Sequence, residues 1–320
     1  MKAITTSNRR PQCRALCALL LGIAALWALP SIARAQLFVS QSNAGSVGEY
    51  DATTGAAINA SFITGLNRPL FGIAVSGNDL FVANSGGTTV GEYDATTGEA
   101  INASFITGLN GPLGLAVSGN TLFVTNNGDG TVGEYNATTG AAMNPRLITL
   151  SGPADLAVSD NHLFVVYNST TVGEFDATTG AAINANLITG LLTSFGLAVS
   201  GNHLFVTNFF ESTVREYNAT TGTAINPRFI TGLDEPDGLT VSGNTLFVSS
   251  VGSGLAQPSG NVGEYDASTG TAVNASLITG LNGPTGLAVG AVPEPSTWSM
   301  IAIGGVALLG IRHRKKHRTA

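Results

Sequence analysis

One unit repeated six times is the feature that most constrains how this chain folds. The tripeptide Leu-Phe-Val recurs at intervals of 41 to 43 residues, and each copy continues into VGEYDATTG or a close variant. The copies begin at Leu37, Leu80, Leu122, Leu163, Leu204 and Leu246. Self-similarity at a fixed period of this length is typical of repeat architectures, in which each unit packs against its neighbours.

Each copy predicts four short β-strands. The segments GLAVS and LFVTN are apolar and rich in branched or aromatic residues, and the SGN between them is typical of a hairpin turn. TVGEYD alternates as a half-buried strand does, and INASFITG supplies a fourth, more polar strand. No part of the repeat region shows a sustained helical period. Four strands in about 40 to 45 residues are the signature of one β-propeller blade.

The two ends of the repeat region complement each other. The first copy starts at its second strand, near Leu37, and the last copy stops after its first strand, GLAVG at Gly286–Gly290. We therefore predict an all-β, six-bladed β-propeller of four-stranded blades, closed by sharing one blade between its N- and C-terminal strands. Closure removes edges that would invite aggregation. An open β-solenoid is the alternative.

The repeats resemble those of NHL-type six-bladed propellers. The motif that carries the resemblance is P-x-G-L-A-V-S-G-N-x-L-F-V-x-N followed by V-x-E-Y-D, and it covers nearly all of Leu37 to Gly290. The resemblance implies the fold but leaves the activity open, because propellers host binding modules, lyases, lactonases and scaffolds.

The N-terminal residues 1–35 predict a secretory signal peptide, which leaves residues 36–291 as the propeller. Arg9, Arg10 and Arg14 precede an apolar run that ends in Ala-Arg-Ala at 33–35. An uncleaved membrane anchor is the alternative interpretation. Both cysteines lie inside the signal, so the processed chain has no disulfide and no thiolate.

The C-terminal residues 292–320 combine VPEPSTW, a glycine-containing apolar run and a basic end. The apolar run predicts a short transmembrane helix whose basic end stays in the cytoplasm. In this order the three parts resemble a PEP-CTERM sorting signal. The resemblance implies processing by an exosortase near Pro293, Glu294 and Pro295, after transient anchoring in the inner membrane. The expected destination is the cell surface or the extracellular matrix.

The charge of the repeat region excludes one class of partner. Between Leu37 and Gly290 there are four arginines, no lysine and 19 acidic residues, and 4 − 19 gives a net charge of −15. So acidic a surface repels phosphate backbones, and nucleic-acid binding is not expected.

Repeated acidic residues have a structural and a chemical interpretation. The Asp of YDATTG is replaced by Asn in two copies, which favours a turn-forming role over metal binding or acid catalysis. The Glu of VGEYD is interpreted as a structural residue of every blade. His162 and His203 are expected to be exposed hairpin residues. We predict no catalytic set, no metal site and no cofactor, with weak Ca²⁺ binding left open.

Sequence variation is concentrated in two classes of loop. The loops that join the second strand to the third, and the fourth strand to the next blade, open on one face of a propeller, here called the variable face. Functional loops on a rigid scaffold are where binding sites occur. The candidate ligand-binding residues are Phe195, Phe209, Phe210, Glu211, Asp234, Glu235 and Asp237. The aromatic rings would stack on sugars and the acids would bind Ca²⁺. The alternative is drift in unconstrained loops, with Phe209 or Phe210 filling a gap between blades.

These features favour a non-enzymatic, exported surface or matrix protein that binds exopolysaccharide in a biofilm, or another extracellular protein. A propeller enzyme of the lactonase-like hydrolase or lyase type is the alternative. Its candidates are Asp155 and Asp237, interpreted as replacing the glycine that starts the first strand in the other copies. A second alternative is an acidic structural protein that binds Ca²⁺ loosely.

Overall fold

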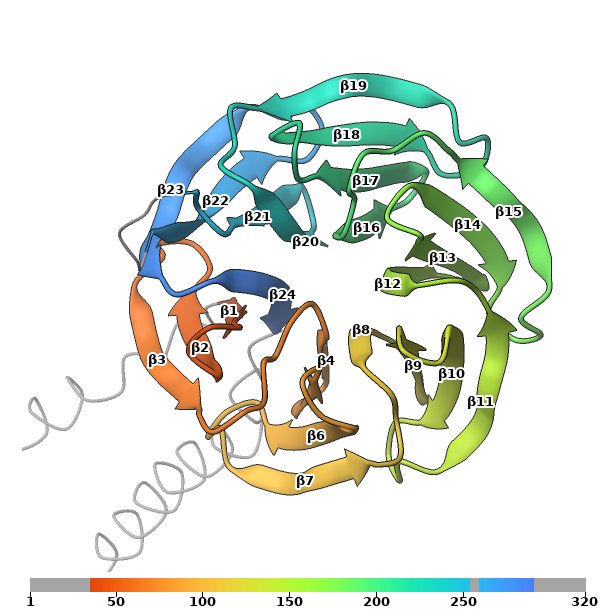
Figure 1. Ribbon diagram of the computed structural model, residues 1–320. Coiled ribbons are helices and arrows are strands. Elements are labelled where there is room, and N and C mark those ends of the chain that lie inside the picture. The colour runs from red at the N-terminus through yellow and green to blue at the C-terminus, as the bar shows by residue number, and fades with distance from the viewer. Residues whose placement is uncertain (1–34, 254–258, 291–320) are drawn as a thin grey trace, which may run out of the picture. The chain divides into compact units, whose positions relative to one another are not determined.

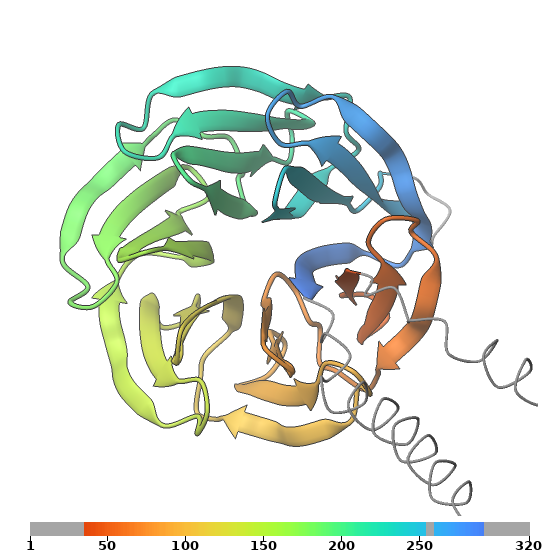
Figure 2. The same ribbon diagram turned by 180° about the vertical axis from the view of Figure 1, so that it is seen from behind.

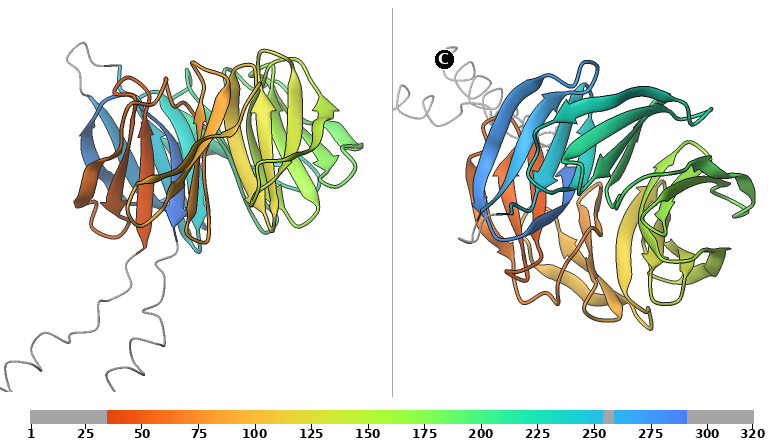
Figure 3. Two further views of the ribbon diagram at one scale, coloured as in Figure 1. Left: turned by 90° about the horizontal axis from the view of Figure 1, so that it is seen from below. Right: turned by 45° about the horizontal axis from the view of Figure 1, so that its top comes forward.

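The computed structural model describes residues 35–253 and 259–290, which form six antiparallel sheets of four strands each. Figure 1 shows the sheets arranged as the blades of a ring, with the first strand of each blade nearest the centre and the fourth at the rim. The ring is seen from behind in Figure 2, and Figure 3 shows it edge-on, with the strands running between its two faces. The fold class predicted from the repeats, an all-β propeller with six four-stranded blades, is confirmed.

Blade 1 contains β24, β1, β2 and β3, and blades 2 to 6 contain β4–β7, β8–β11, β12–β15, β16–β19 and β20–β23. The first strands are β24 (Pro284–Gly290), β4 (Ile73–Ser76), β8 (Pro112–Ser118), β12 (Pro153–Ser159), β16 (Leu197–Ser200) and β20 (Pro236–Ser242). The second strands are β1 (Gln36–Gln41), β5 (Asp79–Asn84), β9 (Thr121–Asn126), β13 (His162–Tyr167), β17 (His203–Asn208) and β21 (Thr245–Ser250).

The third strands are β2 (Ser46–Asp51), β6 (Thr89–Asp94), β10 (Thr131–Asn136), β14 (Thr171–Asp176), β18 (Thr213–Asn218) and β22 (Gly260–Asp266). The fourth strands are β3 (Ala57–Ile63), β7 (Ala100–Ile106), β11 (Ala142–Thr149), β15 (Ala182–Ile188), β19 (Ala224–Thr231) and β23 (Ala272–Leu281).

Blade 1 joins the two ends of the described chain in one sheet. Its first strand, β24, pairs antiparallel with β1, so that Leu37 lies opposite Val289 and Val39 lies opposite Leu287. In the other five blades all four strands are consecutive in sequence.

The hydrophobic core is divided into six clusters, one between each pair of adjacent blades. Because side chains of a strand alternate between the faces of its sheet, the Leu-Phe-Val motif serves two interfaces at once. In β1, Leu37 and Val39 pack against blade 6, whereas Phe38 packs against blade 2. All three side chains are fully buried. Each blade is therefore stabilised mainly by its neighbours.

A glycine in the third strand allows the following tyrosine to lie against its own sheet. A Cβ atom placed on Gly48 would lie 2.6 Å from the Tyr50 ring, which is closer than side-chain contacts permit. The same Gly-Glu-aromatic sequence recurs in every blade except blade 5, where Arg215 stands in place of the glycine. The tyrosine is thus held flat in the interface between blades.

Two predicted segments lie outside the described residues. They are the signal peptide, except for Ala35, and the sorting tail with Pro293, Glu294 and Pro295. In the part of the chain that the structure does describe, there is no helix long and apolar enough to span a bilayer.

Candidate functional site

The repeated aspartates form turns, as their exchange with asparagine indicates. The Asp94 carboxylate accepts hydrogen bonds from the backbone N–H groups of Thr96 and Thr97, both at 2.8 Å, and from the side chain of Asn78 at 2.7 Å. These bonds hold the pKa of Asp94 below its usual value. Asn136 accepts the same two backbone bonds in its blade, at 3.0 and 2.9 Å.

In blades 1, 4 and 5 the repeated glutamate of the third strand has a partner on the neighbouring second strand. In blades 4 and 5 the partner is histidine: His162 Nδ1 lies 2.7 Å from Glu174, and His203 Nδ1 lies 2.6 Å from Glu216. In blade 1 the side chain of Gln36 donates to Glu49 at 2.6 Å. The histidine side chains are about half exposed, as expected, but they contact buried carboxylates, a role that the sequence interpretation missed.

Hydroxyl groups on the second strands link the first strands of adjacent blades around the central channel. In blade 3, Thr125 Oγ1 accepts the backbone N–H of Gly114 at 2.7 Å and donates to the carbonyl oxygen of Ala154, in blade 4, at 2.6 Å. Equivalent hydroxyl groups make such links in three other blades, and they belong to Ser40, Thr207 and Ser249. Blades 2 and 4 have Ala83 and Val166 at this position.

Val166 has no hydroxyl group, and in blade 4 the hydrogen bond to the next blade is made by Asp155 instead. Its Oδ2 atom accepts the backbone N–H of Leu197, in blade 5, at 3.0 Å. In the other copies its position is glycine, as the sequence comparison indicated. Burial raises the pKa of Asp155 to about 7, although two backbone N–H groups oppose the shift.

For Asp237 the sequence alignment was wrong by one residue. Leu239 pairs with Val248 as Leu115 pairs with Val124, so Gly238 is the counterpart of the first-strand glycine. Asp237 instead occupies the position that is phenylalanine in blades 2 and 5. Its side chain is 6% exposed, and its Oδ1 atom has no hydrogen-bond partner among the residues that the structure describes. Burial, followed by the charges of Asp155 and Glu235, raises its pKa well above the usual value.

Four phenylalanine rings form a continuous series from the centre of the ring to the protein surface. Phe71 and Phe195 stack with centroids 5.5 Å apart and ring planes 21° apart. Phe195 meets Phe209 edge to face at 5.9 Å, and Phe209 meets Phe210 in the same way at 5.4 Å. Only the last ring is freely accessible, with 74% of Phe210 exposed.

The structure brings together the three predicted phenylalanines and adds Phe71, which the sequence analysis did not select. The available signal was alignment: Phe71 and Phe195 are the only aromatic residues at the position before the first-strand glycine. The alternative interpretation, that such a ring fills a gap between blades, fits Phe209, because its ring is partly buried between those of Phe195 and Phe210. It does not describe the exposed Phe210.

The predicted acidic residues have separate partners. Glu211 forms an ion pair with Arg215, four residues later. Asp234 accepts the backbone N–H of Ser253 at 3.0 Å, and Glu235 has a left-handed backbone with φ of 57°. Across residues 35–253 and 259–290, no three His, Cys, Asp or Glu side chains are arranged to hold one metal ion.

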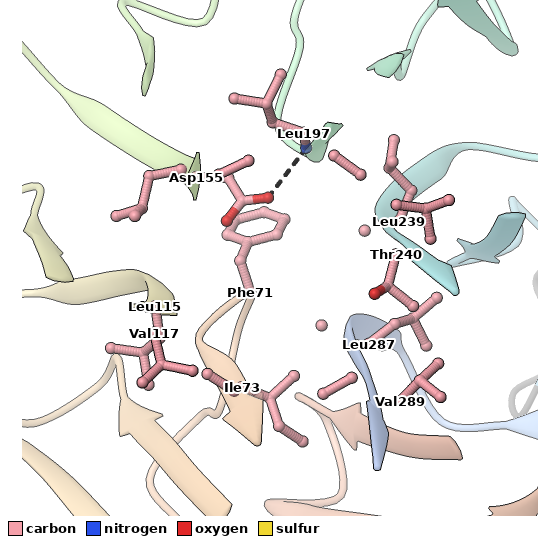
Figure 4. Close-up of a pocket in the computed structure, with 18 of the residues that line it drawn as sticks. Phe71, Ile73, Leu115, Val117, Asp155, Leu197, Leu239, Thr240, Leu287 and Val289 are labelled. Carbon is pink, nitrogen blue, oxygen red and sulfur yellow. Dashed lines mark hydrogen bonds between the residues drawn. The ribbon is translucent and has the colours of Figure 1, made fainter. Parts of the chain in front are cut away.

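The first strands of all six blades surround a central cavity of about 240 Å³. Its walls are mostly Leu, Ile, Val and Ala side chains, together with Phe71. Figure 4 shows the Asp155 carboxyl group among the lining residues, with its hydrogen bond to Leu197, and the hydroxyl group of Thr240 on another wall.

Two solved structures are similar to this chain, and the first of them supports the fold alone. One chain in the crystal structure of a nidogen/laminin complex superposes with a TM-score of 0.65 at 14% identity, covering 80% of this chain and 98% of its own. A computationally designed protein, Ika8, gives a TM-score of 0.47 at 18% identity, covering 77% of this chain and 74% of its own. No curated protein matches the sequence.

Two family models match different parts of the chain. The model described as outer membrane protein assembly factor BamB matches residues 43–276, and the PEP-CTERM protein-sorting motif matches residues 291–315. The motif implies an exported protein that an exosortase sorts to the cell envelope or surface, and the prediction of a PEP-CTERM protein with propeller repeats is confirmed. Because the first match spans most of its length, the chain belongs to the family described as outer membrane protein assembly factor BamB.

Proposed function

We propose that this protein is a non-enzymatic scaffold of the cell surface or extracellular matrix, which binds exopolysaccharide through its variable face. The sorting motif supports export. The near-identity of the six blades supports a rigid scaffold, on which recognition depends on the loops that differ. Another extracellular protein is the alternative partner for the same face.

The observation that carries the proposal is the exposed ring of Phe210. A large aromatic side chain that is 74% exposed leaves apolar surface in water unless a partner covers it. The Phe209 ring packs against it edge to face, and the ion pair between Glu211 and Arg215 holds the next residue in place. A pre-positioned ring loses little conformational entropy on binding, which suits stacking on the apolar face of a sugar.

Binding of exopolysaccharide from the producing bacterium to the purified protein tests the proposal. Replacing Phe210 by alanine is expected to weaken binding by about two- to tenfold, since one aromatic contact contributes about 0.5–1.5 kcal/mol. Ile183→Ala removes a side chain that is 52% exposed on the outer strand β15 and is the matched control. Equal binding by wild type and Phe210→Ala would overturn the role of this face.

The proposed lack of enzymatic activity and the role of Ca²⁺ need separate measurements. A screen with lactone, ester and glycoside substrates is expected to show no turnover. Turnover that disappears in Asp155→Asn would favour the enzyme instead. Because Glu211 and Asp234 already have partners, chelating Ca²⁺ is expected to leave polysaccharide binding unchanged. Loss of binding on chelation would favour a calcium-dependent structural role.

A further inference from the structure

Two large apolar side chains are exposed on the variable face, and both belong to blade 5. All other exposed large apolar side chains of the described residues lie on the fourth strands, at the rim. The two exceptions are Leu192, which is 55% exposed, and Phe210. The position of Leu192 is polar in the five other copies, where it is Asn67, Asn110, Ser151, Asp234 or Asn282. The repeat therefore supplies no structural reason for an apolar side chain there.

The loops that carry Leu192 and Phe210 contact each other. The backbone N–H of Phe209 donates to the carbonyl oxygen of Thr193 at 3.1 Å, so each exposed side chain lies one residue from the same hydrogen bond. The Phe209 ring also packs edge to face against the Phe210 ring. Leu192 and Phe210 thus belong to one area of the variable face, here called the blade 5 patch.

Carboxyl groups border the blade 5 patch. Glu211 directly follows the exposed ring in sequence. The next loop carries Asp234 and Glu235, and it is joined to the first by a hydrogen bond at 3.3 Å, in which the backbone N–H of Leu233 donates to the carbonyl oxygen of Ser212. The apolar surface of the patch is therefore flanked by acidic side chains from two adjacent blades.

These acidic residues differ in how far their charge is neutralised. Glu211 is paired with Arg215. Asp234 accepts one backbone N–H, and neither Asp234 nor Glu235 forms an ion pair with another described residue. They lie in a domain that has four arginines and 19 acidic residues. Charge complementarity favours a positively charged partner for the patch and disfavours one with carboxylate groups.

The backbone of the same three loops is strained. Thr193, Ser212 and Glu235 have φ values of 52°, 58° and 57°, in the left-handed region. A β-branched residue such as threonine is an outlier there, at a cost in free energy that glycine avoids. In blades 1, 3 and 4 the position of Thr193 and Glu235 is occupied by Gly283, Gly111 and Gly152. Strain of this kind is concentrated at functional sites, which agrees with a binding role for these loops.

We propose that the blade 5 patch binds a polysaccharide with free amino groups, such as a partly deacetylated hexosamine polymer. Phe210 and Leu192 cover the apolar face of the sugar rings, and the carboxylates of Asp234 and Glu235 attract the ammonium groups. Acidic polysaccharides are repelled because they meet a face of their own charge. This inference rests on the proposed function and names the class of polysaccharide.

Calorimetry with three hexasaccharides tests the proposal on the purified protein at pH 6. The hexamers of glucosamine, N-acetylglucosamine and galacturonic acid are cationic, neutral and anionic. The cationic hexamer is expected to bind at least about tenfold more tightly than the neutral one, and the anionic hexamer not detectably. Added salt should reduce this preference, because it screens exposed charges.

The outcomes separate this inference from the function on which it rests. Equal binding of the cationic and neutral hexamers, lost in Phe210→Ala, would overturn the inference and leave a polysaccharide-binding face. Tighter binding of the anionic hexamer would also overturn it. Failure of all three hexamers and of the exopolysaccharide to bind would overturn both.

Variants that remove charge locate the recognition of the amino groups. The double variant Asp234→Asn/Glu235→Gln is expected to weaken binding of the cationic hexamer about three- to tenfold, towards that of the neutral hexamer. Asparagine at 234 retains an acceptor for the Ser253 N–H. Glu99→Gln alters an exposed acid in a turn of the opposite face and is the matched control, with no change expected. Unchanged binding in the double variant would contradict the assignment.

Acetylation of the exopolysaccharide from the producing bacterium provides a readout that needs no variant. Converting its amino groups to amides removes their positive charge and preserves the sugar rings. Binding to the wild-type protein is expected to fall about tenfold or more. Binding that complete acetylation leaves unchanged would show that amino groups are not recognised.

Discussion

The rings of Phe71 and Phe195 stack at 5.5 Å, although they come from blades on opposite sides of the propeller. Residues at the same position of the repeat thus meet across the channel, where two blades supply aromatic side chains and a third supplies Asp237. This one layer contains the base of the aromatic series that ends at Phe210 and the buried side chain of Asp237. The asymmetry of an otherwise regular ring is concentrated here.

The stacked pair is expected to couple blades 2 and 5 energetically. In a double-mutant cycle of Phe71→Ala and Phe195→Ala, unfolding in urea should give a coupling of about 0.5–1.5 kcal/mol, the usual range for aromatic pairs. Strictly additive single effects would mean that the contact contributes nothing to stability.

Asp155 is expected to make the folded protein less stable as the pH rises from about 4 to about 7. Its folded pKa of about 7 exceeds the ordinary value of 3.8, so in this interval the folded state retains a proton that the unfolded state has lost. The effect is at most about 4 kcal/mol, since one pKa unit corresponds to 1.36 kcal/mol. It disappears below pH 4 and is constant above pH 7.

The pH effect is measured as the difference between wild type and Asp155→Asn. Asparagine retains an acceptor for the Leu197 N–H but does not ionise. The variant should therefore gain stability relative to wild type between pH 4 and pH 7, in urea unfolding at a series of pH values. A difference that does not change with pH would contradict the raised pKa.

The hydroxyl link of Thr125 is expected to stabilise the junction of blades 3 and 4. Thr125→Val removes the bonds to Gly114 and Ala154, and leaves a buried N–H and a buried carbonyl group without that partner. The free energy of unfolding should fall by about 1–3 kcal/mol. Thr121→Val, at the start of the same strand, is the control and should change stability by less than about 0.5 kcal/mol. Comparable losses in both variants would rule out a specific role for the link.

The turn role of the repeated Asp or Asn can be tested at Asn136. Asn136→Asp should preserve stability, because the carboxylate of Asp94 accepts the same backbone bonds in its blade. Asn136→Ala removes the acceptor for two N–H groups and for the Thr139 hydroxyl, and should cost about 1 kcal/mol. Chemical denaturation of the two variants distinguishes them. A neutral alanine variant would assign the turn to its glycine and threonine residues alone.

Much of the fold was predictable from the sequence because the repeat reports the same local structure six times. The alternation in Leu-Phe-Val, the SGN turn and the Asp/Asn exchange each depend on contacts within one blade, or on the strand geometry that every blade shares. The prediction of four strands and six blades is confirmed on that basis. The misplacement of Asp237 was avoidable, since PDGLTVS aligns with PLGLAVS and places Gly238 at the position of Gly114, as the strand register confirms.

The candidate site was predictable only as a region. The sequence selected Phe195, Phe209 and Phe210, but it did not identify Phe71 as the ring that completes the series. It also grouped acids that have different partners, because the ion pair of Glu211 depends on an arginine that replaces a repeated glycine. The histidine partners of the buried glutamates were missed for a similar reason, since pairing across neighbouring strands depends on register.

By itself the sequence determined the period, the strand order within each blade and the sorting motif, all of which are local patterns. Only the tertiary structure decided which exceptional side chains meet. Ring closure brings equivalent positions of distant copies to one axis, where the Asp237 side chain is buried and Phe71 contacts Phe195. Burial and electrostatic coupling depend on neighbours that are far apart along the chain, so they exist only once the ring of blades has formed.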